Sequence, residues 1–424
     1  MIVHSVLPGE TIYSIAERFG VSSDWLLINN QLEEQEPLAV GQSLVVLFPK
    51  ETYTVMQGDD LASIADSHGV SLVQLLRNNP QLSNREYIYP GETLIISYTD
   101  EKSMEISTNG YAFPFIDTDT LRMTLPYLTY LTIFYYQITM EGDLVDIEEQ
   151  ELIDIAKGYG VASIMLISTL TDTGVSDIEV AHSLFASLEK QNRLIERVLG
   201  IMKVKGYYGL NVDIQDILEE DRQSYLEFLE RISNRVKQEG YIMLTTVTPN
   251  TFQSKTASMY QGPEYAIIGQ LSDSNMLLSY EWGYSFSPRL ALPLNSVRAL
   301  IEYATTQISP EQINIGLPTV GYFWALPFVE GKSVANAISY KAALELARDV
   351  GAEIQRDEAS MAPFFTYTEE HEHVVWFRDA INIAALLGFV VEYNLEGIGT
   401  WNIMHFAAGI WMVINAMFDI NKVI

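Results

Sequence analysis

Apolar residues beyond about residue 105 follow two alternating patterns. Short apolar runs, which fit buried strands, are separated by segments in which apolar residues recur every three or four positions, as in amphipathic helices. Eight such strands separated by helices are typical of a TIM (β/α)8 barrel, an α/β fold. The predicted strands are 105–113, 127–135, 161–168, 207–214, 241–247, 275–281, 313–319 and 396–401.

The segments between and after these strands predict further parts of the barrel domain. Residues 221–238 predict a helix with one apolar face, because five apolar residues recur there at helical spacing. Residues 325–376 exceed what a barrel turn needs, so they predict a small inserted α+β subdomain. The apolar segment 406–420 is too short to span a bilayer and predicts a closing helix on the core.

The first hundred residues contain an internal repeat. HSVLPGETIYSIAERFGVSSDWLLINN, from residue 4, aligns with YTVMQGDDLASIADSHGVSLVQLLRNN, from residue 53. Each copy ends in an apolar strand after a glycine turn. The pattern predicts a strand, two helices and a strand in each copy. Both copies resemble the LysM module along their full length.

The LysM resemblance implies two sugar-binding grooves, because members of that family hold chains of N-acetylglucosamine between two loops. Here the loops would be 8–12 with 29–32, and 57–61 with 78–82. Each residue could instead serve only to shape a turn. The implied sugar-binding residues are Gly9, Asn30, Gly58 and Asn79. We expect modules at 1–49 and 50–98, a polar linker at 98–103, and the barrel domain within 99–424.

Polar and apolar residues alternate along the predicted fourth strand. The alternation directs Leu210 and Val212 outward, and it directs Asn211, Asp213 and Gln215 into the barrel near its carboxyl end. Polar side chains that point inward are costly unless they are hydrogen-bonded. The pattern therefore favours a functional role over a purely structural one.

This strand and several other motifs resemble glycoside hydrolase family 18, in particular its LysM-bearing spore-germination N-acetylglucosaminidases. The family reads Asp-x-x-Asp-x-Asp-x-Glu at this strand, so Asp213 matches the last Asp and Gln215 occupies the position of the catalytic Glu. Residues 277–282 and 321–324 match further family patterns, and residues 372–377 resemble an element of the spore branch. The site that the resemblance implies has three catalytic positions, Asp213, Gln215 and Tyr280, and five substrate-binding ones, Asn211, Glu281, Trp282, Tyr322 and Trp401.

The resemblance also implies a substrate-assisted mechanism. In it, the Glu protonates the leaving oxygen while the N-acetyl carbonyl of the sugar attacks the anomeric carbon. Asp213 and Tyr280 would orient the N-acetyl group, and Trp401 would stack on the sugar ring. Gln215 can donate a hydrogen bond but cannot transfer a proton. We therefore predict a glycan-binding protein whose barrel is hydrolytically impaired or inactive.

Three alternatives remain open. Glu219 or Glu220, in the following loop, could supply the proton of an active N-acetylglucosaminidase. Gln215 could be an engineered replacement in an active enzyme, although Ile214 and Glu281 also depart from the family pattern and favour natural divergence. Finally, the chain could be a structural protein of a spore layer.

Composition and charge limit the partners. The formal net charge is −30, so phosphate backbones and anionic membrane surfaces would be repelled; we expect neither nucleic acid binding nor membrane insertion. Neutral glycans of the peptidoglycan or chitin type, or spore coat or cortex proteins, are better partners. The chain has no cysteine, and His371 and His373 lack further ligand spacing, so no metal or cofactor is expected. The start of the chain does not resemble a secretory signal, and the family resemblance implies a spore or cell-wall location.

Overall fold

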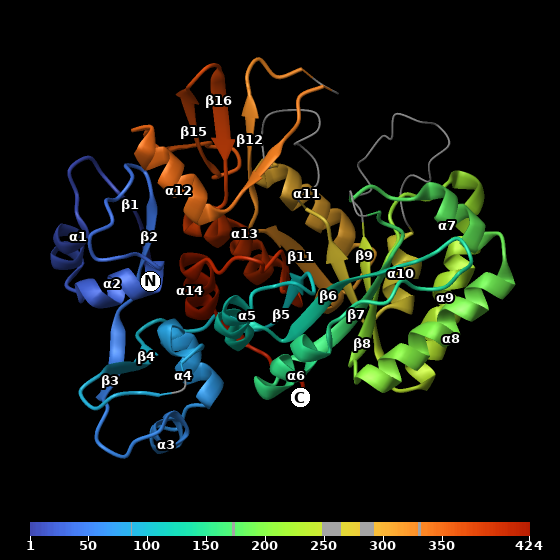
Figure 1. Ribbon diagram of the computed structural model, residues 1–424, viewed down its shortest axis with the longest axis horizontal. Helices are drawn as coiled ribbons and strands as arrows, with labels where there is room; N and C mark the ends of the chain where they lie inside the picture. The colour runs from blue at the N-terminus through green and yellow to red at the C-terminus, as the bar shows by residue number, and fades with distance from the viewer. Residues whose placement is uncertain (86, 172–173, 248–263, 280–291, 330–331) are drawn as a thin grey trace.

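The computed structural model describes residues 1–424 except 86, 172–173, 248–263, 280–291 and 330–331. Its largest part is a closed barrel of parallel strands, in which the last strand pairs with both its predecessor and the first strand. The eight predicted strands and the TIM-barrel fold are confirmed (Figure 1). The barrel strands are β5 (Met104–Ala112), β6 (Tyr130–Gln137), β7 (Ala162–Ser168), β8 (Gly209–Asp213), β9 (Ile242–Val247), β10 (Ser274–Leu277), β11 (Ile313–Pro318) and β17 (Gly397–Trp401).

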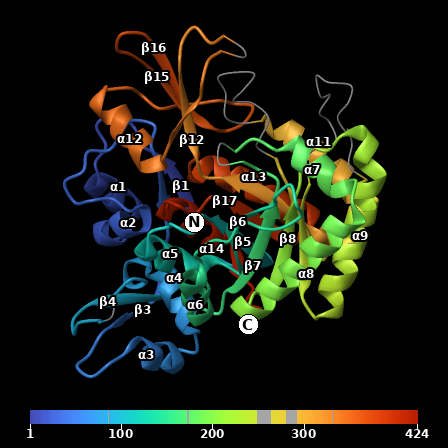
Figure 2. The same cartoon turned by 45° about the vertical axis from the view of Figure 1, so that its right-hand side comes forward.

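Helices cover the outside of the barrel (Figure 2). The predicted helix at 221–238 is α9, which buries all five residues of its predicted apolar face. The outward residues of β8, Leu210 and Val212, join the same large apolar core as α9. The helices of the barrel domain are α5 (Thr118–Thr124), α6 (Gln150–Gly158), α7 (Ile178–Phe185), α8 (Leu188–Lys205), α9 (Arg222–Gln238), α10 (Tyr265–Leu271), α11 (Leu294–Thr305), α13 (Ala380–Tyr393) and α14 (Ala408–Met417).

The two N-terminal modules have the predicted strand–helix–helix–strand order. The first contains β1 (Ile2–Ser5), α1 (Ile12–Phe19), α2 (Ser23–Asn30) and β2 (Ser43–Val46), and the second contains β3 (Pro49–Thr54), α3 (Leu61–Ser67), α4 (Leu72–Asn78) and β4 (Thr93–Tyr98). Each module pairs its two strands antiparallel around a small apolar core of its own.

Both modules dock on the barrel domain. Val45 and Ile95 belong to the large barrel core, and the Tyr127 hydroxyl donates to the Arg77 carbonyl at 2.8 Å. The predicted linker at 98–103 is also docked, because the Ser103 N–H donates to a carbonyl at the end of α14. The modules therefore pack on the barrel domain and are not joined to it by a flexible linker alone.

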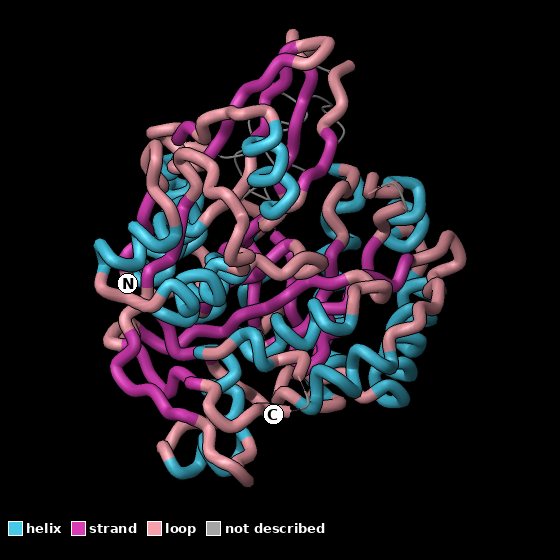
Figure 3. The backbone as a smooth tube through the Cα atoms, turned by 60° about the vertical axis from the view of Figure 1, so that its left-hand side comes forward, coloured by secondary structure: helices cyan, strands magenta, loops and turns pink. Residues whose placement is uncertain are grey.

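The inserted subdomain is an antiparallel sheet with one helix, and it follows the carboxyl end of β11. Its elements are β12 (Gly321–Ala325), β13 (Asn336–Ile338), α12 (Tyr340–Asp349), β14 (Gln355–Arg356), β15 (Pro363–Thr368) and β16 (Glu372–Trp376). The sheet order is β13-β12-β16-β15-β14. Figure 3 shows these strands standing above the barrel.

The end of the chain packs beside the start of β5 and against the second module, where the Asn415 Nδ2 donates to the Asn78 Oδ1 at 3.0 Å. The predicted closing helix is α14, and the chain then adds β18 (Phe418–Ile420), a short strand parallel to β5 that the sequence did not reveal. Among the described residues, no helix is both long and apolar enough to cross a membrane.

Candidate functional site

Polar side chains from β5, β8 and β9 meet inside the barrel near the carboxyl ends of the strands. The Asn211 Nδ2 donates to the Tyr111 hydroxyl at 3.0 Å, and the Thr246 hydroxyl donates to the Asn211 Oδ1 at 3.4 Å. Asn211 is fully buried, and Asp213 is 4% exposed. The inward direction predicted for these residues agrees with this geometry. Sequence reasoning missed Tyr111 and Thr246, although both lie near the carboxyl ends of predicted strands.

Asp213 and Gln215 form a hydrogen-bonded pair at the end of β8. The Gln215 Nε2 donates to the Asp213 Oδ1 at 2.8 Å. Burial raises the pKa of Asp213 to about 6, while hydrogen bonds from Gln215 and Thr246 act in the opposite direction. The pair therefore consists of one buried carboxyl group and one carboxamide without an acidic proton.

The acidic residues nearest in sequence to Asp213 and Gln215 lie in the segment that follows β8. Glu219 and Glu220 are exposed in a short 3₁₀ turn, and the Glu220 carboxylate lies 3.8 Å from the His182 ring on α7. His182 also contacts Asp221 at 2.8 Å, and this contact raises the pKa of His182. Within the described residues, neither glutamate hydrogen-bonds to Asp213 or Gln215.

Aromatic rings surround Trp401 at the end of β17. Its ring centroid lies 4.6 Å from that of Phe134 and 6.0 Å from those of Tyr111 and Phe113. Phe113 stacks in turn on Phe115, at 5.3 Å, and Phe115 is 77% exposed. A row of rings thus leads from the barrel interior to solvent. Of these rings, only Trp401 was predicted to bind sugar, because Phe113, at the end of a predicted strand, and Phe115, just beyond it, belong to no recognisable motif.

The other predicted positions of this site lie beyond the ends of β10 and β11. Tyr280, Glu281 and Trp282 lie outside the described residues. Tyr322 is half-buried on β12, with its ring 6.1 Å from that of Trp324. The structure therefore brings Asn211, Asp213, Gln215 and Trp401 to one end of the barrel and places Tyr322 on the inserted sheet.

A second, half-buried carboxyl group, that of Glu396, lies where β17 begins. Glu396 shares its Oε2 with the Ser274 hydroxyl at 2.7 Å and the Asn314 Nδ2 at 2.8 Å. Burial raises the pKa of Glu396 to about 7. Its position at the start of a strand is at the end of the barrel opposite to Asp213, where side chains usually serve the stability of the fold.

Equivalent loops of the two modules have the same geometry. Gly9 has a φ of +82° and Gly58 a φ of +97°, and both are exposed with open space around the missing side chain. A carboxylate closes each turn: Glu10 accepts from the Leu7 N–H, and Asp59 accepts from the Met56 N–H, both at 2.8 Å. These glycines are required by backbone conformation.

The two module asparagines, for which a sugar-binding role is predicted, make hydrogen bonds within their own modules. The Asn30 Nδ2 donates to the carbonyls of Leu26 and Val45, and its Oδ1 accepts from the Val45 N–H. Asn79 makes the corresponding three hydrogen bonds in the second module. Both side chains are buried and engaged on both of their polar atoms, so they hold helix to strand.

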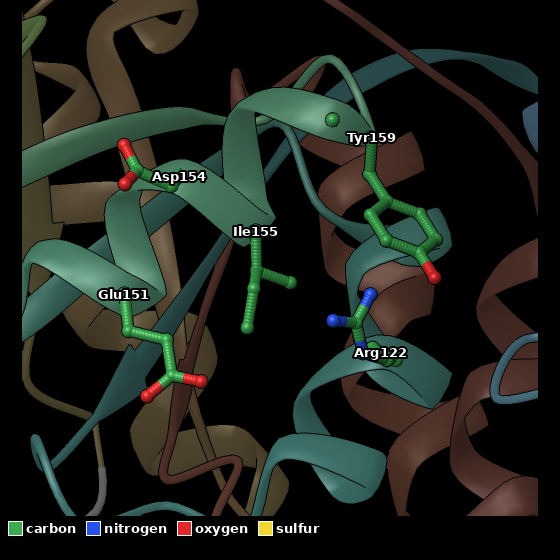
Figure 4. Close-up of a pocket in the computed structure, with 6 residues that line it drawn as sticks. Arg122, Glu151, Asp154, Ile155 and Tyr159 are labelled. Atoms are coloured by element: carbon green, nitrogen blue, oxygen red, sulfur yellow. The ribbon is translucent and has the colours of Figure 1, made fainter.

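A separate pocket lies on the outer surface between α5 and α6 (Figure 4). It is lined by Arg122, Glu151, Asp154, Ile155, Gly158 and Tyr159. The Tyr159 hydroxyl donates to the Ser83 carbonyl of the second module at 2.8 Å, so the pocket adjoins a docking contact. Among the described residues, no group of three or more histidine and carboxylate side chains is arranged to hold a metal ion.

Comparison with known proteins decides the family. A model described as glycosyl hydrolases family 18 matches residues 95–405, which is more than half of the chain. The chain belongs to glycoside hydrolase family 18. A LysM domain model matches residues 4–47 and 53–97, in agreement with the repeat.

Two of the similar proteins described here align with both parts of this architecture. A cortical fragment-lytic enzyme of Bacillus anthracis is 28% identical over 424 residues, which cover 99% of this chain and 98% of the relative. The cortical fragment-lytic enzyme of Bacillus subtilis is 32% identical over 304 residues, or 71% and 70% of the two chains. The crystal structure of the spore cortex-lytic enzyme SleL of Bacillus cereus aligns with a TM-score of 0.82 at 28% identity, covering 99% of this chain and 98% of SleL.

Proposed function

We propose that this protein binds N-acetylglucosamine-containing glycans of the spore or cell wall, and that its barrel keeps a sugar cleft with little or no hydrolytic activity. The observation that carries this proposal is the Gln215 carboxamide, which donates to Asp213 at 2.8 Å in the position where the family has its acid. Family membership, the LysM modules and the names of the cortex-lytic relatives support a peptidoglycan ligand. A coat or cortex protein is a second class of partner that suits the acidic surface.

The division of roles that we propose is the one that the family resemblance implies. Asp213 would accept a hydrogen bond from the N-acetyl group and position its carbonyl toward the anomeric carbon. Trp401 would stack on the apolar face of the sugar, and Phe113 and Phe115 would extend the stacking surface outward. Gln215 would donate to the glycosidic oxygen, and no proton would reach the leaving group. Binding would therefore persist while hydrolysis fails.

A second candidate is an active N-acetylglucosaminidase, as the names of the cortical fragment-lytic relatives suggest. Its proton donor would be Glu219 or Glu220, or a Glu at position 215 in a parent form. Turnover by the protein with Gln215 distinguishes the two candidates, and this test is developed below.

Trp401→Ala is expected to weaken binding of chitotetraose at the barrel by about 30-fold, because an aromatic anchor in a binding cleft contributes about 2 kcal/mol. Trp401→Phe keeps a stacking ring and is expected to lose less than half of that binding energy. Isothermal titration calorimetry measures both, with circular dichroism to verify folding. Equal affinities of the wild type and Trp401→Ala would mean that this ring is only part of the aromatic packing.

The modules are expected to supply the anchoring to insoluble glycan. Replacing both Gly9 and Gly58 with Val should distort the two exposed loops, since a β-branched residue strongly disfavours positive φ. Pull-down on insoluble peptidoglycan should fall by about tenfold, because two linked weak sites act together.

A matched control comes from the same modules. Gly20 and Gly69 have φ of +69° and open space around them, but they end helices away from the proposed grooves. Replacing this pair with Val should cost similar stability and leave the pull-down unchanged. If the two double variants lose binding equally, the loss reflects unfolding of the modules, and the groove assignment is wrong.

A further inference from the structure

The last loop of the first module lies against the inserted subdomain. The Arg348 guanidinium on α12 pairs with the Glu36 carboxylate at 2.6 Å and donates to the Pro37 carbonyl at 3.4 Å. The Ile354 N–H donates to the Val40 carbonyl at 2.9 Å. Only 12% and 16% of the Arg348 and Glu36 side chains are exposed, so this ion pair is less screened than a surface pair.

Gly41 allows this approach. A Cβ atom at position 41 would overlap the Ile354 carbonyl oxygen. The equivalent glycine of the second module, Gly91, has a similar positive φ, +93° against +84°, but no atom lies within 4 Å of the place that its Cβ would take. Both glycines are needed for their turns, and Gly41 alone is also needed for contact with the subdomain.

The corresponding loop of the second module faces solvent. Its residues Tyr87 and Tyr89 are exposed, whereas the equivalent loop of the first module contributes Ala39 to the apolar core of the subdomain. The other members of that core that lie on α12 or just after it are Ala343, Leu344, Ala347 and Ile354. Contact with the subdomain is therefore a property of the first module and not of the LysM fold in general.

The inserted sheet has two different faces. Phe365 and Val375 point to the face that packs on α12 and Ala39. Trp324 and Trp376 belong to the opposite face, together with half-buried Tyr322. The first module thus supports the back of the sheet, and Tyr322 lies on its front. Figures 1 and 2 show α12 between the first module and the strands of the sheet.

The root of the sheet is attached to Trp401. Thr319, between β11 and β12, donates its N–H to the Trp401 carbonyl at 2.8 Å, and its hydroxyl donates to the Asn402 carbonyl. The sheet therefore has a fixed point beside Trp401 at one end. The contact of α12 and Ile354 with the first module provides a second support away from that root.

We propose that the first LysM module positions the inserted subdomain, and through it the wall of the barrel cleft that carries Tyr322. Glu36 and Arg348 are positioning residues in this arrangement, since neither would touch the sugar. Without the module contact, the sheet would keep its root and the contacts of residues 356–360 with α11 and α13, where Arg356 pairs with Asp379 at 2.6 Å. It would lose the support behind α12 and would sample more orientations relative to Trp401. The proposal rests on the proposed function, because it assumes that a glycan occupies the cleft between Trp401 and Tyr322.

Hydrogen–deuterium exchange tests the support without any ligand. In the full chain, Gly41→Ala is expected to raise exchange in β12, β15 and β16, because the added methyl group must push Ile354 away. Gly91→Ala carries the same backbone strain without the clash, and it should raise exchange only within the second module. Equal exchange of the inserted sheet in the two variants would overturn the proposal.

Binding of chitotetraose tests the consequence for the cleft. Gly41→Ala and Arg348→Ala are expected to weaken the Trp401-dependent part of binding by about three- to tenfold, which lies within the range of couplings carried through packed elements. Gly91→Ala should leave that part unchanged. Combining Glu36→Arg with Arg348→Glu should restore more than half of the lost affinity, which loss of fold alone would not allow.

The outcomes separate this inference from the proposed function. If the wild type shows no Trp401-dependent binding of chitotetraose, the cleft assignment fails, while the exchange experiment still reports on the support. If the wild type binds chitotetraose and both Gly41→Ala and Arg348→Ala bind it as tightly as the wild type does, the module does not position the cleft wall. Should Gly41→Ala fail to fold, Arg348→Ala and the charge exchange decide the matter.

Discussion

Gln215→Glu is expected to raise N-acetylglucosaminidase activity by about 10²–10⁴-fold, the usual contribution of a positioned general acid. Gln and Glu are nearly isosteric, so the replacement should keep the position of the side chain. The protonated carboxyl group of this variant could also donate to the Asp213 Oδ1, as the Gln215 Nε2 does at 2.8 Å. Asp213 would still orient the N-acetyl nucleophile, and the missing proton would now be supplied.

The assay compares both forms on muropeptides and chromogenic chitooligosaccharides under one set of conditions. Gln215→Ala should stay inactive, which excludes an effect of loosening the pocket. Adding Asp213→Asn to Gln215→Glu should abolish the gain, because the N-acetyl group would lose its orienting carboxylate. Gln215→Glu without any gain would mean that Ile214 or Glu281 has reshaped the pocket, since a shift of about 1 Å can cost about 10²-fold.

Robust turnover by the protein with Gln215 would contradict the proposed loss of activity. Glu219→Gln and Glu220→Gln would then identify the substitute acid. Glu220 lies 3.8 Å from the His182 ring, so its removal should also lower the pKa of His182, to which it makes a minor contribution. Loss of turnover in only one of the two variants would assign the proton donor.

Much of the fold could be predicted because hydrophobic periodicity is a local signal. The alternation in β8 placed Asn211 and Asp213 inside the barrel and Leu210 and Val212 outside it, as observed. The repeat likewise gave the strand and helix order of both modules. Each of these predictions depended only on residues that are close together in the sequence.

Contacts between distant segments could not be predicted in this way. Tyr111 meets Asn211 across one hundred positions, and Phe113 approaches Trp401 across nearly three hundred, so no local pattern connects them. The sequence also suggested a sugar-binding role for Asn30, whereas the fold uses its amide to hold β2. A polar residue in a turn has the same local signature in either role, and only its hydrogen-bond partners distinguish the two.

Asp213→Asn is expected to make the protein more stable near pH 7.5 by about 3 kcal/mol, with little change near pH 4. Burial raises the pKa of Asp213 from 3.8 to about 6 in the folded protein, so the folded state binds this proton more tightly than the unfolded chain does. The contribution of the protonated Asp213 carboxyl group to the free energy of unfolding is fully present below about pH 4 and is lost as the pH rises through about 6. A difference of about two pKa units corresponds to about 3 kcal/mol.

Urea denaturation of the full chain between pH 4 and pH 8 measures this effect. Asp213→Asn should flatten the decline between pH 4 and pH 6, while the decline due to Glu396, whose pKa is raised to about 7, should remain. Asp216→Asn is the matched control, because Asp216 is exposed and close in sequence, and its charge makes the smallest contribution to the raised pKa of Asp213. If Asp213→Asn and the wild type lose stability in parallel over this range, the carboxyl group of Asp213 is already ionised at low pH. A stabilised Asp213→Asn that also binds chitotetraose more weakly would show that the buried carboxyl group is retained for ligand binding at the expense of stability, as expected where a site is preorganised.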